Sequence, residues 1–304
     1  MKILITGSSG LLGLNLALEL SANHKVVGAD RNPLKSGPQF EPMTVDLLAP
    51  DAVARLLDQV RPDAMIHCAA LANVDACESD PEAAQRLNAW LPGEIAARCA
   101  EHGAQLVHIS TDAVFDGAKG GYTEEDVPHP LSVYAQTKLD GEQAVFSAMP
   151  GAVVTRINIF GWSATANRSL AEFFYYGLAV GKPLKGFTDV RFCPLLVNDL
   201  AGVFTRIFEQ RLSGLYHLVS PQGLSKYEFG VRIAEKFGFD PAGIEPVKVA
   251  DFGLKAARSP LLTLDTGKLS QALGQPLPDV FDGLERFYQL HQQGHPEKLK
   301  AMLV

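Results

Sequence analysis

A glycine-rich turn between an apolar strand and an apolar helix constrains this chain more than any other feature. The run KILIT (2–6) is typical of a buried strand, and the segment 11–23 is typical of a helix. Between them lie Gly7, Gly10 and Gly13 in a G-x-x-G-x-x-G pattern. The first glycine permits a tight bend, the second lets the backbone approach a pyrophosphate, and the third lets helix and strand pack closely. The helix start adds free N–H groups and a positive dipole end, which favour bound phosphate.

Short apolar runs alternate with helical patterns throughout the first half of the chain. Asp80 as an N-cap and Pro81 at the first helical position begin the longest predicted helix. Strands are predicted at 2–6, 24–30, 41–45, 63–70, 105–111 and 152–157. Helices are predicted at 11–23, 50–60, 81–102 and 132–148. Alternating strands and helices form βαβ units, and nearly continuous apolar strands are covered on both faces. The sequence therefore predicts an α/β fold with a doubly wound parallel (Rossmann) sheet.

The second half of the chain is less regular. Another helix begins at Ser225, where S-K-Y-E forms a capping box, and the stretch 241–260 is predicted to be loop with a strand. A further strand and three further helices are predicted at 214–220, 169–180, 197–210 and 281–293. We therefore expect a dinucleotide-binding domain and a smaller, discontinuous α/β substrate-binding domain. The first would comprise 1–156 with about 191–219, and the second 157–190 with 220–304.

An acidic residue lies at the end of the second predicted strand, where a dinucleotide-binding domain needs one. Asp30 can accept hydrogen bonds from both hydroxyl groups of an adenosine ribose. A carboxylate there repels a 2′-phosphate, which favours NAD(H) as the cofactor. Arg31 follows immediately and could offset this repulsion, so NADP(H) stays the alternative.

A tyrosine and a lysine lie four residues apart on the helix predicted at 132–148. Tyr134 and Lys138 form Y-x-x-x-K, and residues at i and i+4 share one helix face. A nearby ammonium and a cationic nicotinamide would lower the tyrosine pKa from its ordinary value of about 10. Thr111 ends the strand 105–111 at the carboxyl edge of the sheet, where it could hydrogen-bond a substrate carbonyl.

Charge and composition argue against several classes of protein. The net charge of −7 without a block of like charges argues against a nucleic-acid partner. No apolar run approaches the roughly 20 residues of a membrane helix, and the start of the chain does not resemble a signal peptide. The four cysteines form no C-x-x-C pair, and no His/Cys spacing indicates a metal site. We therefore expect a cytoplasmic protein without a metal that binds a small molecule, and a homodimer stays open.

Longer stretches surround these motifs, namely ALANVDACE (70–78), HISTDAVFDG (108–117), PLSVYAQTKLDGE (130–142) and ARSPLLTLDTGKL (257–269). Over nearly the whole chain they resemble the extended short-chain dehydrogenase/reductases, and most closely the dTDP-4-dehydrorhamnose reductases. The resemblance implies reduction of a 4-keto nucleotide sugar by NAD(P)H. Hydride would go to the C4 carbonyl carbon, with the tyrosine as general acid.

The resemblance and the motifs together nominate the site residues. The catalytic triad would be Thr111, Tyr134 and Lys138. The dinucleotide would contact Gly7, Gly10, Leu11, Leu12, Gly13, Asp30, Arg31, Asp46, Leu47, Ala69, Ala70, Leu71, Ser110, Tyr134 and Lys138. The substrate would contact Thr111, Asp112, Asn158, Arg191 and Arg258. Asn88 matches an asparagine of the active-site helix in the superfamily.

Two alternative functions stay open. Asn158 lies in R-I-N-I-F-G (156–161) and resembles the asparagine of epimerases and dehydratases in this branch, which would hold NAD tightly. The segment D-V-R-F-C-P-L (189–195) also departs from the D-Q-x-G-x-P-T of the reductases, so the sugar-binding part of the site differs. The third reading is a non-catalytic dinucleotide-binding regulatory subunit, as in methionine adenosyltransferase. The intact Thr111, Tyr134 and Lys138 argue against it.

Overall fold

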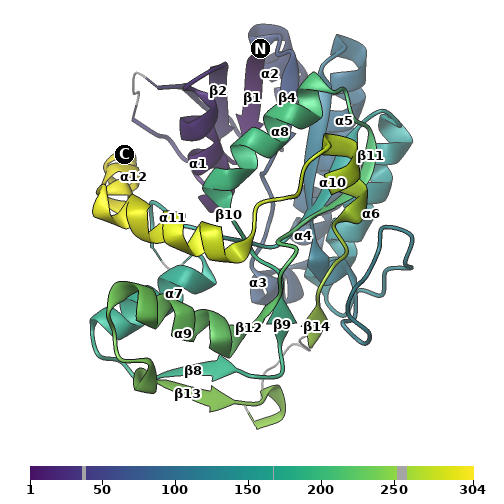
Figure 1. Cartoon of the computed structure of the whole chain (residues 1–304). Helices are drawn as coiled ribbons and strands as arrows, with labels where there is room; N and C mark the ends of the chain where they lie inside the picture. The colour runs from purple at the N-terminus through teal and green to yellow at the C-terminus, as the bar shows by residue number, and fades with distance from the viewer. Residues whose placement is uncertain (36–38, 167, 252–258) are drawn as a thin grey trace.

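The computed structural model describes residues 1–35, 39–166, 168–251 and 259–304. Its main sheet has seven parallel strands in the order β11-β6-β5-β4-β1-β2-β3 (Figure 1). The strands are β1 (Lys2–Thr6), β2 (Lys25–Asp30), β3 (Glu41–Thr44), β4 (Ala64–His67), β5 (Gln105–Thr111), β6 (Val153–Ile157) and β11 (Gly214–Leu218). The strand order reverses between β1 and β4, which is where ligands bind in open α/β sheets. The predicted doubly wound parallel sheet is confirmed.

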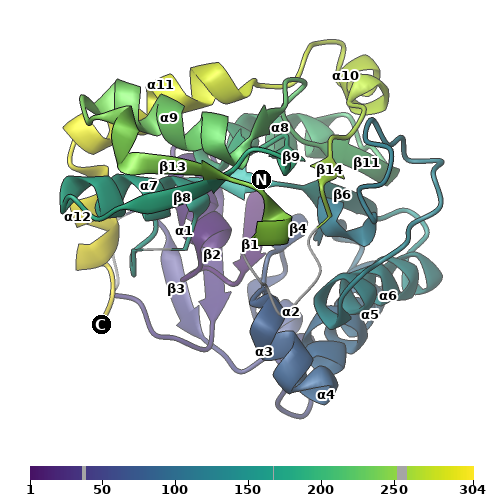
Figure 2. The ribbon, with the colours of Figure 1, turned by 90° about the horizontal axis from the view of Figure 1, so that it is seen from below.

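Helices cover both faces of this sheet, which explains why its strands are apolar almost throughout. Ile3 and Ile5 pack on one face and Leu4 on the other, because successive side chains of a strand alternate. Figure 2 shows α8 and α11 on one side of the sheet, and α5 and α6 on the other. The first face packs against α1 (Leu11–Leu20), α8 (Leu200–Glu209) and α11 (Val280–Gln292). The second packs against α2 (Ala52–Val60), α5 (Leu91–His102) and α6 (Val133–Ala148).

Three small sheets and two helices lie beyond the carboxyl edge of the main sheet (Figure 1). The helices are α7 (Leu170–Ala179) and α9 (Lys226–Phe237). The sheets pair β7 (Ile159–Phe160) with β10 (Leu195–Leu196), β8 (Leu184–Phe187) with β13 (Ile244–Val247), and β9 (Arg191–Phe192) with β12 (Leu224–Ser225) and β14 (Leu261–Leu262). The predicted capping box begins α9, since Ser225 and Glu228 each accept the other's backbone N–H. The division into two domains stays a prediction.

The chain has more short helices than the sequence predicts. The segment 81–102 is helical but consists of α4 (Pro81–Gln85), a π-helical turn η1 (Arg86–Trp90) and α5, with Asp80 as the expected cap. The helix predicted at 197–210 begins with the turn η3 (Val197–Asp199) and continues as α8. The unpredicted elements are α3 (Val74–Ser79), α10 (Gly267–Leu273), α12 (His295–Ala301), η2 (Asp112–Val114), η4 (Pro241–Gly243) and η5 (Val249–Asp251). The helix predicted to be last is therefore followed by another. One or two turns contain too few apolar residues to show a helical period. Among the described residues, no helix combines the length and apolarity of a membrane span.

Two buried histidines lie side by side in the main sheet. His67 of β4 and His108 of β5 are paired in register, and their rings stack with centroids 5.3 Å apart. His67 Nδ1 shares a 2.7 Å hydrogen bond with Thr6 Oγ1. Its Nε2 and both nitrogens of His108 have no hydrogen-bond partner among the described residues. Burial lowers the pKa of His67 to about 3, and it lowers the pKa of His108 well below the ordinary value.

This pair predicts sensitivity to mild acid. Below the ordinary pKa of 6.5 the imidazoles bind protons in the unfolded chain but not in the folded one. The free energy of unfolding therefore decreases as the pH decreases. Over the first pH unit below the ordinary pKa each such group costs about 1 kcal/mol, so we expect the pair to account for a loss of about 2 kcal/mol between pH 6.5 and 5.5. Burial also lowers the pKa of His217 to about 4, which adds a loss of about 1 kcal/mol, and it raises the pKa of Asp112 to about 6, which offsets somewhat less than that.

Urea unfolding at the two pH values measures this loss. The His108→Leu variant should lose about 1 kcal/mol less than the wild type over this range, because one buried imidazole is removed. His129 is exposed, so His129→Leu is the matched control and should keep the wild-type dependence. Equal pH dependence in the wild type and His108→Leu would contradict the explanation.

Candidate active site

A cavity of about 730 Å³ opens at the carboxyl edge of the main sheet and is lined by twelve of the residues nominated from the sequence. They are Gly7, Gly10, Leu11, Leu12, Gly13, Ala70, Ser110, Thr111, Asp112, Tyr134, Lys138 and Asn158. Cys68, Asn73 and Arg168 also line it, although the sequence did not single them out. A second hollow of about 710 Å³ lies between α1, α8 and α11 and contains none of the nominated residues. The first cavity is therefore the candidate active site.

The glycine turn at one end of this cavity has the geometry that its spacing predicts. Gly7 has a φ of +68°, and a Cβ there would lie 2.8 Å from the backbone nitrogen of Ala69. A Cβ on Gly13 would lie 2.2 Å from the carbonyl oxygen of Gly7. Both positions therefore require glycine. Gly10 precedes α1 without a capping side chain, so the N–H groups of the first helical turn are available to an anion.

Asp30 is held against the glycine turn at the end of β2. Its Oδ2 accepts the Ser9 N–H at 3.0 Å, and its Oδ1 accepts the Asn32 N–H at 2.9 Å. The carboxylate is thus fixed beside the turn, although it does not line the cavity itself. Arg31 is exposed at the next position. The roles of this carboxylate and this guanidinium in the choice between the two dinucleotides stay predictions.

Four other residues nominated for the dinucleotide lie around the cavity rather than in its lining. Asp46 Oδ1 accepts the Leu48 N–H at 3.0 Å, and Leu47 is buried in the core beside α2. The Ala69 N–H donates to Thr6 Oγ1 at 3.4 Å, and the Leu71 N–H donates to Asn88 Oδ1 at 2.9 Å. Their roles toward a cofactor stay predictions.

Tyr134 and Lys138 both reach the cavity from the first turns of α6. The hydroxyl of Ser132 caps this helix by accepting the Ala135 N–H at 3.2 Å. Lys138 is buried, and its Nζ donates to the Ile109 carbonyl oxygen at 2.6 Å. That bond fixes the ammonium at the end of β5.

Burial dominates the proton affinity of both groups. It raises the pKa of Tyr134 to about 12, while interaction with the Thr111 side chain acts in the opposite direction. It lowers the pKa of Lys138 to about 8. The sequence predicts that Lys138 lowers the Tyr134 pKa. In the folded protein, burial has the larger effect and raises that pKa. The phenol stays protonated at neutral pH, which is the form that a general acid needs.

Three polar side chains at the ends of β5 and β6 are joined by hydrogen bonds. Thr111 Oγ1 donates to Asp112 Oδ1 at 3.2 Å, and Asn158 Nδ2 donates to Asp112 Oδ2 at 2.6 Å. Asp112 is buried, and burial raises the pKa of its carboxyl group to about 6. All three were nominated for the substrate, and they line the cavity together with Tyr134.

Asn88 connects the loop after β4 to α6. Its Nδ2 donates to the Leu71 carbonyl oxygen and to Thr137 Oγ1, both at 3.1 Å, while its Oδ1 accepts from the Leu71 N–H. It lies in the π-helical turn η1, and such turns are frequent at functional sites. A Cβ on Gly141 would lie 2.1 Å from the Asn88 carbonyl oxygen, so this contact requires glycine in α6. Asn88 therefore positions the helix that presents Tyr134.

A buried ion pair beneath the site was missed by the sequence analysis. Glu142 Oε1 accepts Ser110 Oγ at 2.5 Å and Arg156 Nε at 3.0 Å, and Glu142 Oε2 accepts Arg156 Nη2 at 2.7 Å. The Glu142 and Arg156 side chains are only 4% and 3% exposed. Glu142 lies four residues after Lys138 on α6, and that spacing was the available signal. Nothing in the sequence around Arg156 on β6 indicates that it pairs with Glu142.

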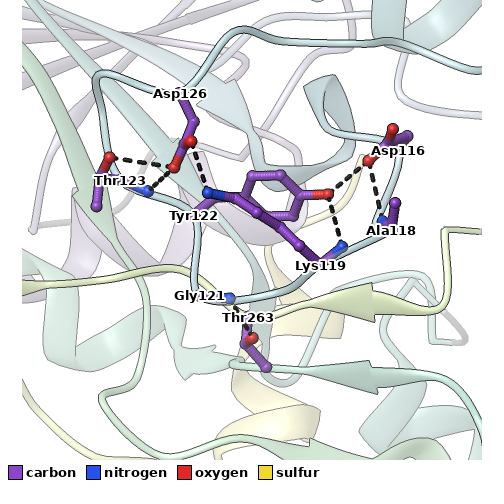
Figure 3. Close-up of polar contacts among 8 residues, drawn as sticks. All are labelled: Asp116, Ala118, Lys119, Gly121, Tyr122, Thr123, Asp126 and Thr263. Atoms are coloured by element: carbon purple, nitrogen blue, oxygen red, sulfur yellow. Dashed lines mark hydrogen bonds and ion pairs between the residues drawn. The ribbon is translucent and has the colours of Figure 1, made fainter.

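The loop that follows Thr111 is tied to the carboxyl-terminal part of the chain, as Figure 3 shows. Tyr122 Oη donates to Asp116 Oδ1 at 2.5 Å, and Lys119 Nζ lies 2.6 Å from Asp126 Oδ1. The Gly121 N–H donates to Thr263 Oγ1 at 2.8 Å, and the Tyr122 N–H donates to the Thr263 carbonyl oxygen at 3.0 Å. This loop therefore holds the segment around β14 next to the end of β5, the strand that ends at Thr111.

The two arginines nominated for the substrate are not in the cavity lining. Arg191 lies in β9, where its Nη1 is 3.3 Å from Glu228 Oε2 and its Nη2 donates to the Gly223 carbonyl oxygen at 2.9 Å. Arg258 lies outside the described residues. A substrate role for either stays a prediction.

Comparison with known proteins agrees with this geometry. The family model described as RmlD substrate binding domain matches residues 1–293. A protein of Haloferax volcanii named "probable low-salt glycan biosynthesis reductase Agl14" is 34% identical over 292 residues, which are 93% of this chain and 96% of that protein. Methionine adenosyltransferase 2 subunit beta of Rattus norvegicus is 34% identical over 287 residues, which are 91% of this chain and 84% of that protein.

A solved structure also superposes over nearly the whole chain. A dTDP-4-dehydrorhamnose reductase of Clostridium acetobutylicum has a TM-score of 0.86 at 29% identity, covering 96% of this chain and 100% of that one. The family model matches residues 1–293, and the Haloferax volcanii protein is 34% identical over most of the chain. These two findings assign the chain to a family. The chain belongs to the RmlD substrate binding domain family, within the extended short-chain dehydrogenase/reductases.

Proposed function

We propose that this protein is an NAD(P)H-dependent reductase of a 4-keto nucleotide sugar. The observation that carries the proposal is the single cavity that contains both the glycine turn and the Tyr134, Lys138 and Thr111 side chains. A dinucleotide at the glycine turn and a sugar at Tyr134 would then share one continuous space. The dTDP-4-dehydrorhamnose reductase of Bacillus anthracis, solved in complex with NADP, supports the cofactor class at 26% identity and a TM-score of 0.85.

The side chains of the cavity fit the proton chemistry of such a reduction. The bound dinucleotide supplies a hydride to the carbonyl carbon, so negative charge develops on the carbonyl oxygen. Tyr134, protonated at neutral pH because burial raises its pKa to about 12, donates its proton to that oxygen. The hydroxyl of Thr111 hydrogen-bonds the same oxygen and stabilises the developing charge. Lys138, held at the Ile109 carbonyl, binds the ribose beside the nicotinamide and supplies a positive charge near the phenol.

A steady-state assay tests the proposal. The purified protein should oxidise NADH or NADPH in the presence of a 4-keto nucleotide sugar such as dTDP-4-dehydrorhamnose, one cofactor molecule for each sugar reduced. UDP- and GDP-linked 4-keto sugars belong in the same panel, because the nucleotide is part of the question. The absence of oxidation with every member, despite measurable cofactor binding, would contradict the proposal.

One comparison favours a second candidate, a non-catalytic regulatory subunit. A methionine adenosyltransferase 2 subunit beta matches 91% of this chain at 34% identity. Cofactor binding without turnover would be expected from such a subunit. NAD that stays bound through purification in a one-to-one ratio would instead favour an epimerase or dehydratase.

The position of Asp30 predicts a preference for NAD(H) over NADP(H). Its carboxylate is fixed beside the glycine turn by the Ser9 and Asn32 N–H groups, where it would repel a 2′-phosphate. Asp30→Ala should narrow the ratio of the two dissociation constants by roughly 10-fold or more, since hydrogen bonds to a charged group contribute about 1.5–3 kcal/mol. Titration of both cofactors measures this ratio. Binding of NADP(H) more than tenfold tighter than NAD(H) in the wild type would contradict the role given to Asp30.

A further inference from the structure

We propose that Arg168 binds the diphosphate of the nucleotide sugar. The inference deepens the proposed function and rests on it. Arg168 lines the same cavity as Tyr134 and Asn158, and it is exposed to that space. It comes from the turn between β7 and α7, in the part of the chain that follows Asn158 and is predicted to bind the substrate.

The turn that presents Arg168 is built around a fully buried carboxylate. Glu172 is 0% exposed, and its oxygens accept the Ser163 N–H at 2.7 Å, the Arg168 N–H at 2.8 Å and the Ser169 N–H at 3.2 Å. Ser163 Oγ donates to the same carboxylate at 2.9 Å. The buried group therefore fixes the Arg168 backbone relative to α7. Glu172 also forms the capping box of α7 with Ser169, so the turn and the helix start are held as one unit.

The Arg168 side chain is oriented without being neutralised. Its Nε donates to Thr165 Oγ1 at 3.1 Å, which directs the guanidinium along the turn. Within the described ranges, no carboxylate forms an ion pair with it, and neither terminal amino group has a hydrogen-bond partner. A guanidinium with both terminal groups available can bind two phosphate oxygens at once.

The charges of the cavity lining leave this role to Arg168. The charged side chains described in that lining are Asp112, Lys138 and Arg168. Lys138 is buried at the Ile109 carbonyl and is assigned to the nicotinamide ribose in the proposed function, and Asp112 would repel a phosphate. The cofactor pyrophosphate would be bound by the N–H groups of the glycine turn and of the start of α1. The second diphosphate, that of the substrate, needs a cation, and Arg168 is the exposed one.

Arg191, nominated for the substrate from the sequence, is already engaged elsewhere. It contacts Glu228 and the Gly223 carbonyl, and it does not line the cavity. The diphosphate is therefore assigned to Arg168 by the structure, whereas the sequence nominates Arg191 for the substrate. Variants of both residues distinguish the two assignments.

The experiment compares Arg168→Ala, Arg168→Lys and Arg191→Ala with the wild type, and Arg232→Ala serves as the matched control. Arg232 lies on the surface of α9 in a weak 3.4 Å ion pair with Glu235. The dissociation constants of dTDP, UDP, thymidine and NADH are measured by calorimetry on the full chain, which needs no turnover. Where turnover is found, kcat and KM for the nucleotide sugar are added.

We expect Arg168→Ala to weaken whichever of dTDP and UDP the wild type binds by roughly 10- to 100-fold. Arg168→Lys should give an intermediate loss, because it keeps the charge and loses the bidentate geometry. Thymidine and NADH should bind as in the wild type, KM should rise with little change in kcat, and Arg232→Ala should change nothing.

Three results would overturn the inference. They are an unchanged nucleoside diphosphate affinity in Arg168→Ala, a loss confined to NADH, which would place Arg168 at the cofactor pyrophosphate, and a loss in Arg191→Ala alone. The diphosphate measurement is independent of catalysis. Failure of the proposed reductase function with a diphosphate loss in Arg168→Ala would therefore leave the binding role intact.

Discussion

Tyr134→Phe should reduce turnover of the true substrate by roughly 10²–10⁴-fold, since general acid catalysis contributes about that factor. This corresponds to about 3–5 kcal/mol of transition-state stabilisation. The Tyr134 phenol is protonated at neutral pH, and it lines the cavity from α6 together with Thr111, which ends β5. Phenylalanine keeps the ring and removes only the proton donor. Steady-state kinetics with saturating cofactor measure the effect.

The cofactor affinity of this variant is its internal control. It should change little, because the phenol oxygen contributes little to binding a dinucleotide at the glycine turn. Lys138→Met should instead reduce both turnover and cofactor affinity, because Lys138 is expected to bind the nicotinamide ribose. If Tyr134→Phe kept more than a tenth of the wild-type turnover, Tyr134 would not be the general acid. The interpretation as a regulatory subunit would then be favoured.

The features that the sequence predicted correctly are those encoded by neighbouring residues. A Cβ at Gly7 or Gly13 would lie only 2.8 Å or 2.2 Å from neighbouring backbone atoms, so both positions require glycine, and their spacing alone indicates the turn. The side chains of Asp80 and Ser225 cap their helices by accepting the backbone N–H three residues ahead. The pair of Tyr134 and Lys138 needs only one helix to bring both side chains to the same cavity. Local chemistry of this kind is independent of the tertiary fold.

The features that the sequence did not reveal depend on contacts between distant segments. Glu142 is explained only by Arg156 on a neighbouring strand, and Arg168 only by the buried Glu172 that organises its turn. The contacts of Arg191 with Glu228 and the Gly223 carbonyl could not be read from its own segment, and its role toward a substrate stays a prediction. The lowering of the Tyr134 pKa expected from its neighbour was also outweighed by burial, which only the packed structure determines.

The buried ion pair carries the second large expected effect, on stability. Arg156→Leu leaves the Glu142 carboxylate buried with Ser110 as its remaining hydrogen-bond donor. Breaking a buried pair by removing one partner costs about 3–5 kcal/mol, because the remaining charge is desolvated without compensation. Urea unfolding should show that loss at neutral pH. Removing the exposed Arg232, whose side chain is 55% exposed in its pair with Glu235, is the matched control and should cost at most about 1 kcal/mol.

The double variant Arg156→Leu/Glu142→Leu separates the cost of an unpaired charge from the cost of altered packing. Replacing both partners with apolar residues is often close to neutral, so it should recover most of the stability lost by Arg156→Leu. The single variant should also lose less at lower pH. Protonation of a buried carboxylate that has lost its partner removes the penalty of the unpaired charge as the pH falls. A double variant as unstable as Arg156→Leu would mean that the arginine acts through packing, with its guanidinium 4.9 Å from the ring centre of Phe115. Recovery would instead show that the charge of Glu142 is tolerated beneath the active site because Arg156 compensates it.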